Sequence, residues 1–248
     1  MPARGRTVDA GARRADHAPV ILDERRAARG SLAAALIVLA LASLSPFFAP
    51  VPCGGLPAGY APIVALELAR SQSDLDAIFG AEPSACRTTI VAAIDLTDWV
   101  DTFVFAPSYG VFLALFFASR ARSGRAARLG IGLAVTAVAF DLLENACLLT
   151  LTGSLDARSS SAVLLPWMTG VKWLALGMAG LPEAWIFARE GGIASKVGAA
   201  FALLAPVGVA LALVAPARFG AAIALAVTCA WVPCLVSVAI AARRPTTA

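Results

Sequence analysis

Histidine is almost absent from this chain of 248 residues, and the single example is His17, near the N-terminus. Catalysis by a Ser–His–Asp or Cys–His arrangement in the apolar part of the chain is therefore excluded, because both need an imidazole as the base. A zinc-hydrolase site is disfavoured for the same reason, since such sites are built from several His or Cys ligands. We expect no metal centre and no cofactor, and the sequence names no catalytic residue.

Charge is scarce as well. Charged residues make up 15% of the chain and hydrophobic residues 59%, whereas about a quarter of a soluble domain is charged. This composition indicates an integral membrane protein with the lipid bilayer as its first partner. The net charge of +4 does not predict a nucleic-acid partner, because the basic residues lie in short clusters between apolar runs. Lysine occurs twice, as Lys172 and Lys196, while alanine dominates, which we interpret as the usage of a GC-rich bacterium.

What the sequence does contain is a series of apolar runs, each near the ~20 residues that cross a ~30 Å hydrocarbon core. Backbone hydrogen bonds must close within each run, so the runs are predicted to be helices. The second belongs to a longer helix that starts near Thr88. The first is interpreted as a retained helix and not as a signal peptide, because its apolar run and the segment before it are too long. The six expected spans are about 31–49, 99–119, 129–151, 162–187, 196–215 and 220–241.

The distribution of basic residues predicts how these spans are oriented. With the N-terminus inside, fifteen of the twenty Lys and Arg residues fall in cytoplasmic segments and four fall outside, with Lys172 left within a span. This asymmetry indicates six spans with both termini in the cytoplasm. The expected fold is thus an all-α, six-helix membrane bundle in a bacterial inner (plasma) membrane, with N-in/C-in topology.

The segments outside the spans are predicted to differ in order. Residues 1–30 hold seven Arg and no apolar period, which indicates a disordered cytoplasmic tail, and residues 243–248 form a second cytoplasmic tail. In the extracytoplasmic loop 50–98, residues 62–79 are expected to form two short helices that cap the bundle. Ser73 with Asp76 resembles a capping box, and Gly80 is suited to end that helix.

Two of the five cysteines, Cys53 and Cys86, lie in this outer loop. An oxidising compartment on that side favours a disulfide between them, which would pin the loop over the mouth of the bundle. Two free thiols are the alternative. The other three cysteines, Cys147, Cys229 and Cys234, are interpreted as packing residues.

The third span carries polar residues where lipid-facing helices have none. Asp141, Glu144 and Asn145 occupy positions i, i+3 and i+4, so they share one helical face, which must point into the bundle. Asp141 and Lys172 each lie about ten residues, or ~15 Å, below the outer ends of the third and fourth spans. Because a buried charge is costly, we predict an Asp141–Lys172 contact, with Glu144 as the alternative acid and one carboxylate left unmatched.

The second span adds acids at its outer end. Asp95 and Asp98 are interpreted as a solvated face, whereas Asp101 with Thr102 begins the apolar run and is the better candidate for the pocket. Further candidates are Tyr109, deeper in the same helix, and Glu67, in the cap, which either points into the cluster as a lid or reaches water. Pro107 is expected to kink the helix.

Three functions remain open from these residues. The first is a multi-pass membrane protein whose outward-facing carboxylate and lysine pocket binds or carries a small ligand, a cation or a proton. The second is a membrane enzyme that uses Asp141 or Glu144 as an acid–base group on a lipid or isoprenoid. The third is an accessory subunit whose polar cluster only joins helices. The sequence specifies neither a substrate nor an oligomeric state.

Overall fold

The fold is seen in a computed structural model, which describes residues 23–48, 51–56, 62–81, 83–220 and 222–243. Every regular element in these ranges is a helix. Six helices are long and apolar enough to cross a membrane by length and composition. The prediction of an all-helical chain with six membrane-spanning helices is confirmed to that extent.

The helices follow one another with short connections. The elements long and apolar enough to span a membrane are α1 (Glu24–Phe48), α4 (Ala85–Val100) continued by a π-helical turn (Asp101–Phe105) and α5 (Ala106–Ala118), α6 (Arg125–Ser154), α7 (Ser160–Glu190), α8 (Ile193–Ala202) with α9 (Leu204–Val214), and α11 (Ala222–Arg243). Shorter elements are α2 (Pro62–Glu67), α3 (Gln72–Phe79), a 3₁₀ turn (Ala121–Ser123) and α10 (Pro216–Phe219).

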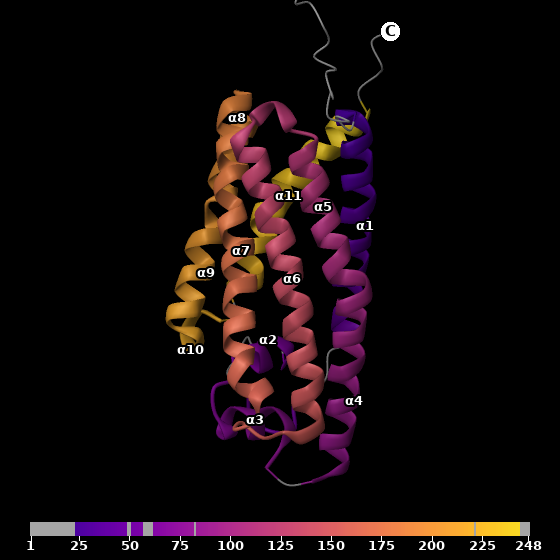
Figure 1. Cartoon of the computed structure of the whole chain (residues 1–248), viewed down its shortest axis with the longest axis vertical. Coiled ribbons are helices and arrows are strands. Elements are labelled where there is room, and N and C mark those ends of the chain that lie inside the picture. Colours follow the sequence, from indigo (N-terminus) through magenta and orange to yellow (C-terminus); the bar gives the residue numbers. More distant parts are fainter. Residues whose placement is uncertain (1–22, 49–50, 57–61, 82, 221, 244–248) are drawn as a thin grey trace, which may run out of the picture.

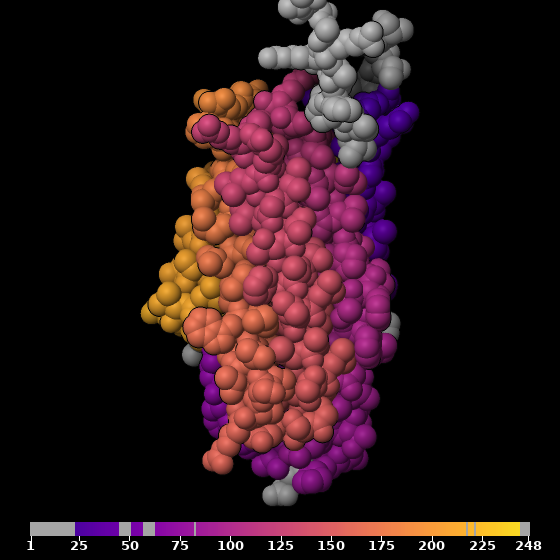
Figure 2. Space-filling model, in the orientation of Figure 1, coloured from indigo at the N-terminus to yellow at the C-terminus, as the bar shows by residue number. Residues whose placement is uncertain are grey.

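The helices form an elongated bundle whose two ends differ (Figure 1). α1 begins and α11 ends at the upper end in this view, which we call the termini end. α2, α3 and the α6–α7 connection lie at the opposite end, which we call the cap end, and α10 stops short of it. Figure 2 shows the face along which α6 and α7 run from one end to the other. The cap end is therefore built on α4, α6 and α7, which extend beyond the α9–α11 hairpin.

Several helices begin earlier than the sequence predicts. α1 starts at Glu24, seven residues before the expected span, so residues 24–30 of the predicted tail are helical. The rest of that tail, residues 1–22, lies outside the described residues, as do residues 244–248 of the C-terminal tail. α4 starts at Ala85, where the Ser84 side chain accepts a hydrogen bond from the backbone N–H of Arg87. An N-cap serine of this kind fixes the start of a helix. The segment predicted as the outer loop 50–98 therefore ends at residue 84, directly before α4 begins.

Proline distorts two of the spans, in different ways. Before Pro107, the predicted kink takes the form of the π-helical turn Asp101–Phe105, because a proline cannot donate the hydrogen bond that would continue the α-helix. The fifth span is divided at Leu203, since Pro206 leaves the carbonyl of Ala202 without its helical donor. That carbonyl packs against Gly180 of α7 so closely that a side chain at residue 180 would collide with it.

The cap has the two short helices that the sequence predicts, with one difference in detail. The capping box is formed by Ser71 and Asp74, each two residues before the predicted Ser73 and Asp76. Gly80 ends α3 with a positive φ of 79°. A disulfide joins Cys53 and Cys86 as predicted, with their Cα atoms 5.8 Å apart, and the backbone N–H of Cys53 donates to Ile78 O at 2.9 Å. The disulfide thus ties the loop after α1 to the start of α4, with α3 between them.

Candidate functional site

Lys172, on α7, is the centre of a buried polar cluster. Its ammonium nitrogen lies 2.5 Å from Glu144 Oε2, 3.1 Å from Glu67 Oε1 and 3.2 Å from Asp141 Oδ1. Only the contact with Glu67 also has hydrogen-bond geometry, so the other two are ion pairs without a directed hydrogen bond. The predicted Asp141–Lys172 contact is present, and Glu144 contacts Lys172 in addition to Asp141 and not in place of it.

Neutral side chains hold each of these carboxylates in position. Tyr109 donates its hydroxyl proton to Asp141 Oδ2 at 2.7 Å, and Thr169 donates to Glu144 Oε1 at 2.9 Å. The indole N–H of Trp173 donates to Glu67 Oε2 at 3.0 Å. Every carboxylate that contacts Lys172 therefore has a second partner, which fixes its orientation in a region where water is scarce.

The structure decides one alternative within this cluster and corrects one expectation. Of the two positions that the sequence left open for Glu67, it has the one in the cluster, because Glu67 is buried and points at Lys172. Glu144 was expected to be the acid without a partner, yet it makes the shortest contact to the ammonium group. α2 packs on α7 near Lys172, so a single ammonium group is shared among three carboxylates from two helices, with Glu67 on α2 and both Asp141 and Glu144 on α6.

A row of polar contacts between α4 and α6 extends the cluster toward the cap. Asn145 donates to Asp101 Oδ2 at 2.7 Å, and Thr152, nearer the cap, donates to Asp95 Oδ1 at 2.6 Å. Thr102 does not join this row, because its hydroxyl donates to the backbone carbonyl of Asp98 in its own helix. Of the seven predicted intramembrane cluster residues, Tyr109, Asp141, Glu144 and Lys172 are joined in one network, Asp101 and Asn145 form a separate pair beside it, and Thr102 joins neither.

Asp98 differs most from its predicted role on a solvated face. It is 1% exposed, and its Oδ2 has no hydrogen-bond partner among the described residues. The reason is the pitch of the helix: Ile90, Ile94 and Asp98 follow at intervals of four residues and share the face that packs into the bundle. Asp95, one position around the helix, is only partly buried.

The cluster holds more acids than bases. Three carboxyl groups, those of Glu67, Asp141 and Glu144, contact the one ammonium group of Lys172, and those of Asp98 and Asp101 are near enough to interact with it electrostatically. Ionised side chains at the centre of a membrane cost about 2.5–3.5 kcal/mol each, so an uncompensated excess of negative charge here would be very unfavourable. Its balance requires protons or a cation. In the part of the chain that the structure describes, no group of three or more His, Cys, Asp or Glu is arranged to hold a metal ion.

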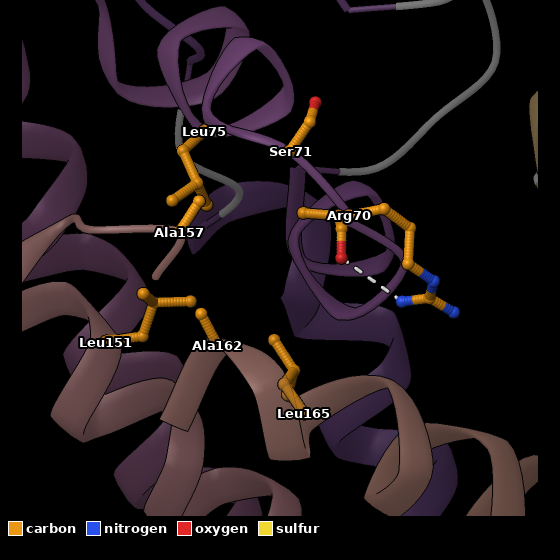
Figure 3. A pocket seen from close by; sticks show the side chains of 8 residues that line it. Arg70, Ser71, Leu75, Leu151, Ala157, Ala162 and Leu165 are labelled. Carbon is orange, nitrogen blue, oxygen red and sulfur yellow. Dashed lines mark hydrogen bonds between the residues drawn. The ribbon is translucent and has the colours of Figure 1, made fainter. Parts of the chain in front are cut away.

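A small cavity lies where the cap meets the ends of α6 and α7 (Figure 3). Its volume is about 20 Å³, which is enough for one water molecule. Leu165, one helical turn before Thr169, is among the side chains that separate the cavity from the cluster. In Figure 3 the cap residues face the ends of α6 and α7 across this space. The lining residues are Ala69, Arg70, Ser71, Leu75, Leu151, Ala157, Ala162 and Leu165.

Arg70 brings the nearest cationic side chain of the cap to this cavity. Its Nη1 donates to the carbonyl oxygen of Ala69 at 3.1 Å, as the dashed line in Figure 3 shows. Partial burial lowers the pKa of the Arg70 guanidinium from its usual value, and the neighbouring Asp74 opposes that effect. An arginine remains charged under such conditions, so the cavity wall carries a positive charge on the cap side.

Sequence reasoning missed several residues of the cluster. Thr169 and Trp173 were not assigned to it, although they stand three residues before and one residue after Lys172. The spacing of Thr169 was a usable signal, since i, i+3 places it on the same face of α7 as the lysine. Trp173 gave no such signal, because its partner Glu67 lies 106 residues away in the sequence.

The chain resembles no known protein closely enough to inform this site. No protein-family model matches it, and searches of curated proteins and of solved structures find no significant similarity.

Proposed function

We propose that this chain is a multi-pass membrane protein that binds and releases protons at the Lys172 cluster, as the intramembrane site of a proton carrier. The observation that carries the proposal is the excess of buried carboxyl groups around one ammonium group. Such a set reaches neutrality by taking up protons, and carboxyl groups held close together exchange protons readily among themselves.

Two features favour a proton over the other ligands that the sequence left open. The point between the carboxylates of Glu67, Asp141 and Glu144 is filled by the Lys172 ammonium, where a bound metal cation would otherwise lie. The cavity under the cap has a volume of about 20 Å³, which suits one water molecule and is far too small for an isoprenoid or acyl chain.

The orientation we propose follows from charge and from the disulfide. Basic residues gather at the segments of the termini end, which by the positive-inside rule is cytoplasmic. The Cys53–Cys86 disulfide lies at the other end, where an oxidising extracytoplasmic space preserves it. In a bacterial inner membrane the cap then covers the cluster on the outer side. An alkaline phosphatase reporter should be active when inserted after Gly80 and inactive when fused after Arg243, and the reverse pattern would exclude this orientation.

Infrared spectroscopy tests the proton site without knowledge of any substrate. The protein in lipid is titrated upward from about pH 6, where solvent-exposed carboxyl groups are already ionised, while the C=O stretching band of protonated carboxylic acids is recorded. The wild type should show a band that appears and disappears reversibly, and Glu144→Gln should lose part of it. The matched control is Glu24→Gln, at a partly exposed acid that pairs with Arg122 at 3.0 Å, and its band should equal that of the wild type. Identical titrating bands in wild type and Glu144→Gln would refute the proposal and favour a purely structural cluster.

A further inference from the structure

Glu183 is a second buried acid, on α7 but far from Lys172 along the helix. It is 1% exposed, and its Oε2 has no hydrogen-bond partner in the part of the chain that the structure describes. The thiol of Cys234 on α11 lies against the carboxyl group, and it also donates to the backbone carbonyl of Ala230 at 3.6 Å. A thiol is a weak partner, and a buried carboxyl group with so little support is costly to keep for packing alone.

The position of Glu183 on α7 relates it to the cluster. Thr169, Lys172, Glu183 and Glu190 are separated by 3, 11 and 7 residues. At ~100° per residue, these intervals bring all four within a stripe about 60° wide. One face of α7 therefore carries polar groups from the cavity under the cap to the termini end of the bundle.

The interval between Lys172 and Glu183 is apolar and closely packed. It covers eleven residues, or ~16 Å along the helix, and Leu176 and Ala179 on this face are buried. Gly180 packs against the backbone of Ala202, where α8 gives way to α9. Protons do not cross such a distance without water, so this interval separates the two acidic sites in the structure as it stands.

A polar contact closes the termini end of the same face. The Arg120 guanidinium, just after α5, donates to Glu190 Oε1 at 2.7 Å and also to the hydroxyl of Ser237 on α11. Its charge lies over the ring of Phe116, 5.5 Å from the centroid. Glu190 is partly exposed, with 35% of its side-chain surface accessible. This polar face of α7 thus reaches solvent at Glu190, two helical turns beyond Glu183. There the Arg120 contact with Glu190 and Ser237 lies between the face and solvent.

We propose that Glu183 is the proton-binding site of the termini end, so that protons pass between it and the Lys172 cluster along one face of α7. The inference rests on the proposed function, because it makes the cluster one of two sites on a transmembrane path. Each step moves one proton from a hydronium ion or a carboxylic acid to a carboxylate, and no other reactant is needed. The titratable or charged groups around Glu183 are Cys234, and toward solvent Arg120 and Glu190.

The path implies that the apolar interval changes during transport. Water must enter between Lys172 and Glu183, and the helix that can move to admit it is the α8–α9 pair, which is interrupted at Leu203. Gly177 and Gly180 let this pair pack directly on α7, against Val209 and Ala202. The interruption gives the pair a bend at the level of the apolar interval, as the packing of Ala202 on Gly180 indicates.

Proton flux tests the inference. The protein is reconstituted in liposomes that contain a pH-sensitive dye, and a potassium gradient with valinomycin provides the driving potential. The wild type should acidify the lumen faster than empty liposomes. Glu183→Gln should lower this rate at least about tenfold, because a positioned proton-transfer group contributes about 10²-fold or more to a rate. Glu24→Gln, at the same end of the bundle, should match the wild type.

Combined with the infrared titration, this experiment separates the two proposals. If the cluster band titrates but Glu183→Gln conducts like the wild type, the inference fails while the proposed function stands. A titrating cluster in a wild type that conducts no protons overturns the inference and the carrier role together, and leaves only proton binding at the cluster. If no carboxyl band titrates, both fail.

A second measurement on the unaltered chain removes any dependence on the folding of Glu183→Gln. A hydrophobic carbodiimide reacts with protonated carboxyl groups in apolar surroundings, and peptide mass spectrometry locates the adduct. We expect an adduct on Glu183 and a flux that falls in proportion to its occupancy. Full modification of Glu183 with unchanged flux would overturn the inference.

Discussion

The two buried acidic sites on α7 differ in how many partners their carboxyl groups have. At Lys172, three carboxylates share one ammonium group and each has a further donor from a neighbouring helix. At Glu183, the carboxyl group has one thiol beside it and one oxygen with no partner among the described residues. The first arrangement is a dense network that holds several helices together, whereas the second leaves an acid free to change its charge.

Because of this difference, replacing a charged side chain should lower the stability by different amounts in the two halves of the bundle. Removing a partner from a buried, paired charge is strongly destabilising, because the remaining charge stays buried. Replacing an acid that has no ionic partner removes only a costly group. Stability measurements therefore distinguish the halves, and the substitutions below are ordered from the largest expected effect to the smallest.

Lys172→Met is expected to have the largest effect. It leaves Glu67, Asp141 and Glu144 next to one another without a cation, and the loss should be about 3–5 kcal/mol of unfolding free energy. Thermal unfolding in detergent measures it, and the double variant Lys172→Met/Asp141→Asn should recover part of the loss. The chain supplies its own control in Lys196→Met, at the other, exposed lysine. Equal melting temperatures for the two single variants would show that the cluster is not an ionic network.

Removal of the disulfide ranks next. Cys53→Ser with Cys86→Ser should lower the stability by about 3–4 kcal/mol in the chain-entropy description, because the bond closes a loop with a sequence separation of 33. The matched control is Cys147→Ser with Cys229→Ser, at two partly buried free thiols. Alkylation after denaturation should find three reactive thiols without reductant and five with it. Five without reductant would contradict the bond itself.

The loss of stability on removing a hydroxyl group near the cluster should depend on whether that group donates to a buried carboxylate or to a backbone carbonyl. Thr169→Val removes a donor to the buried Glu144 carboxylate and should cost about 1.5–3 kcal/mol. Thr102→Val, which removes a bond only to a backbone carbonyl of its own helix, should change the stability by about 0.5 kcal/mol or less. The same thermal unfolding assay compares the two. A Thr102 variant that is as destabilised as the Thr169 variant would place Thr102 in the cluster after all.

The smallest effect is expected at the termini end. Arg120→Gln breaks the contact with Glu190, in which the two side chains are 16% and 35% exposed, and should cost about 1 kcal/mol or less. Arg122→Gln breaks the much more exposed pair with Glu24 and should leave the melting temperature unchanged. If Arg120→Gln destabilises as much as Lys172→Met, the termini end holds an ionic network of its own and the contrast between the two halves is lost.

Depth counting from the sequence placed Lys172 and Asp141 together, and it worked because antiparallel neighbours with short connections meet at equal depth. The same counting did not find Glu183. Its position within a span was visible, but nothing in the sequence told which residues of other helices would face it. The burial of Asp98 was predictable in principle from the four-residue spacing Ile90, Ile94 and Asp98, yet its nearness to Asp95 and Asp101 favoured a solvated stripe.

By itself, the sequence determined the apolar helices, their number and the disulfide, because hydropathy, helix length and the count of outer-loop cysteines are local properties. Tertiary structure decided which carboxylates share Lys172 and which have no ionic partner. Glu67 reaches Lys172 across 105 residues, through the way α2 packs on α7. Such a contact depends on how helices rotate and pack against one another, and those angles are set by side chains from the whole bundle at once.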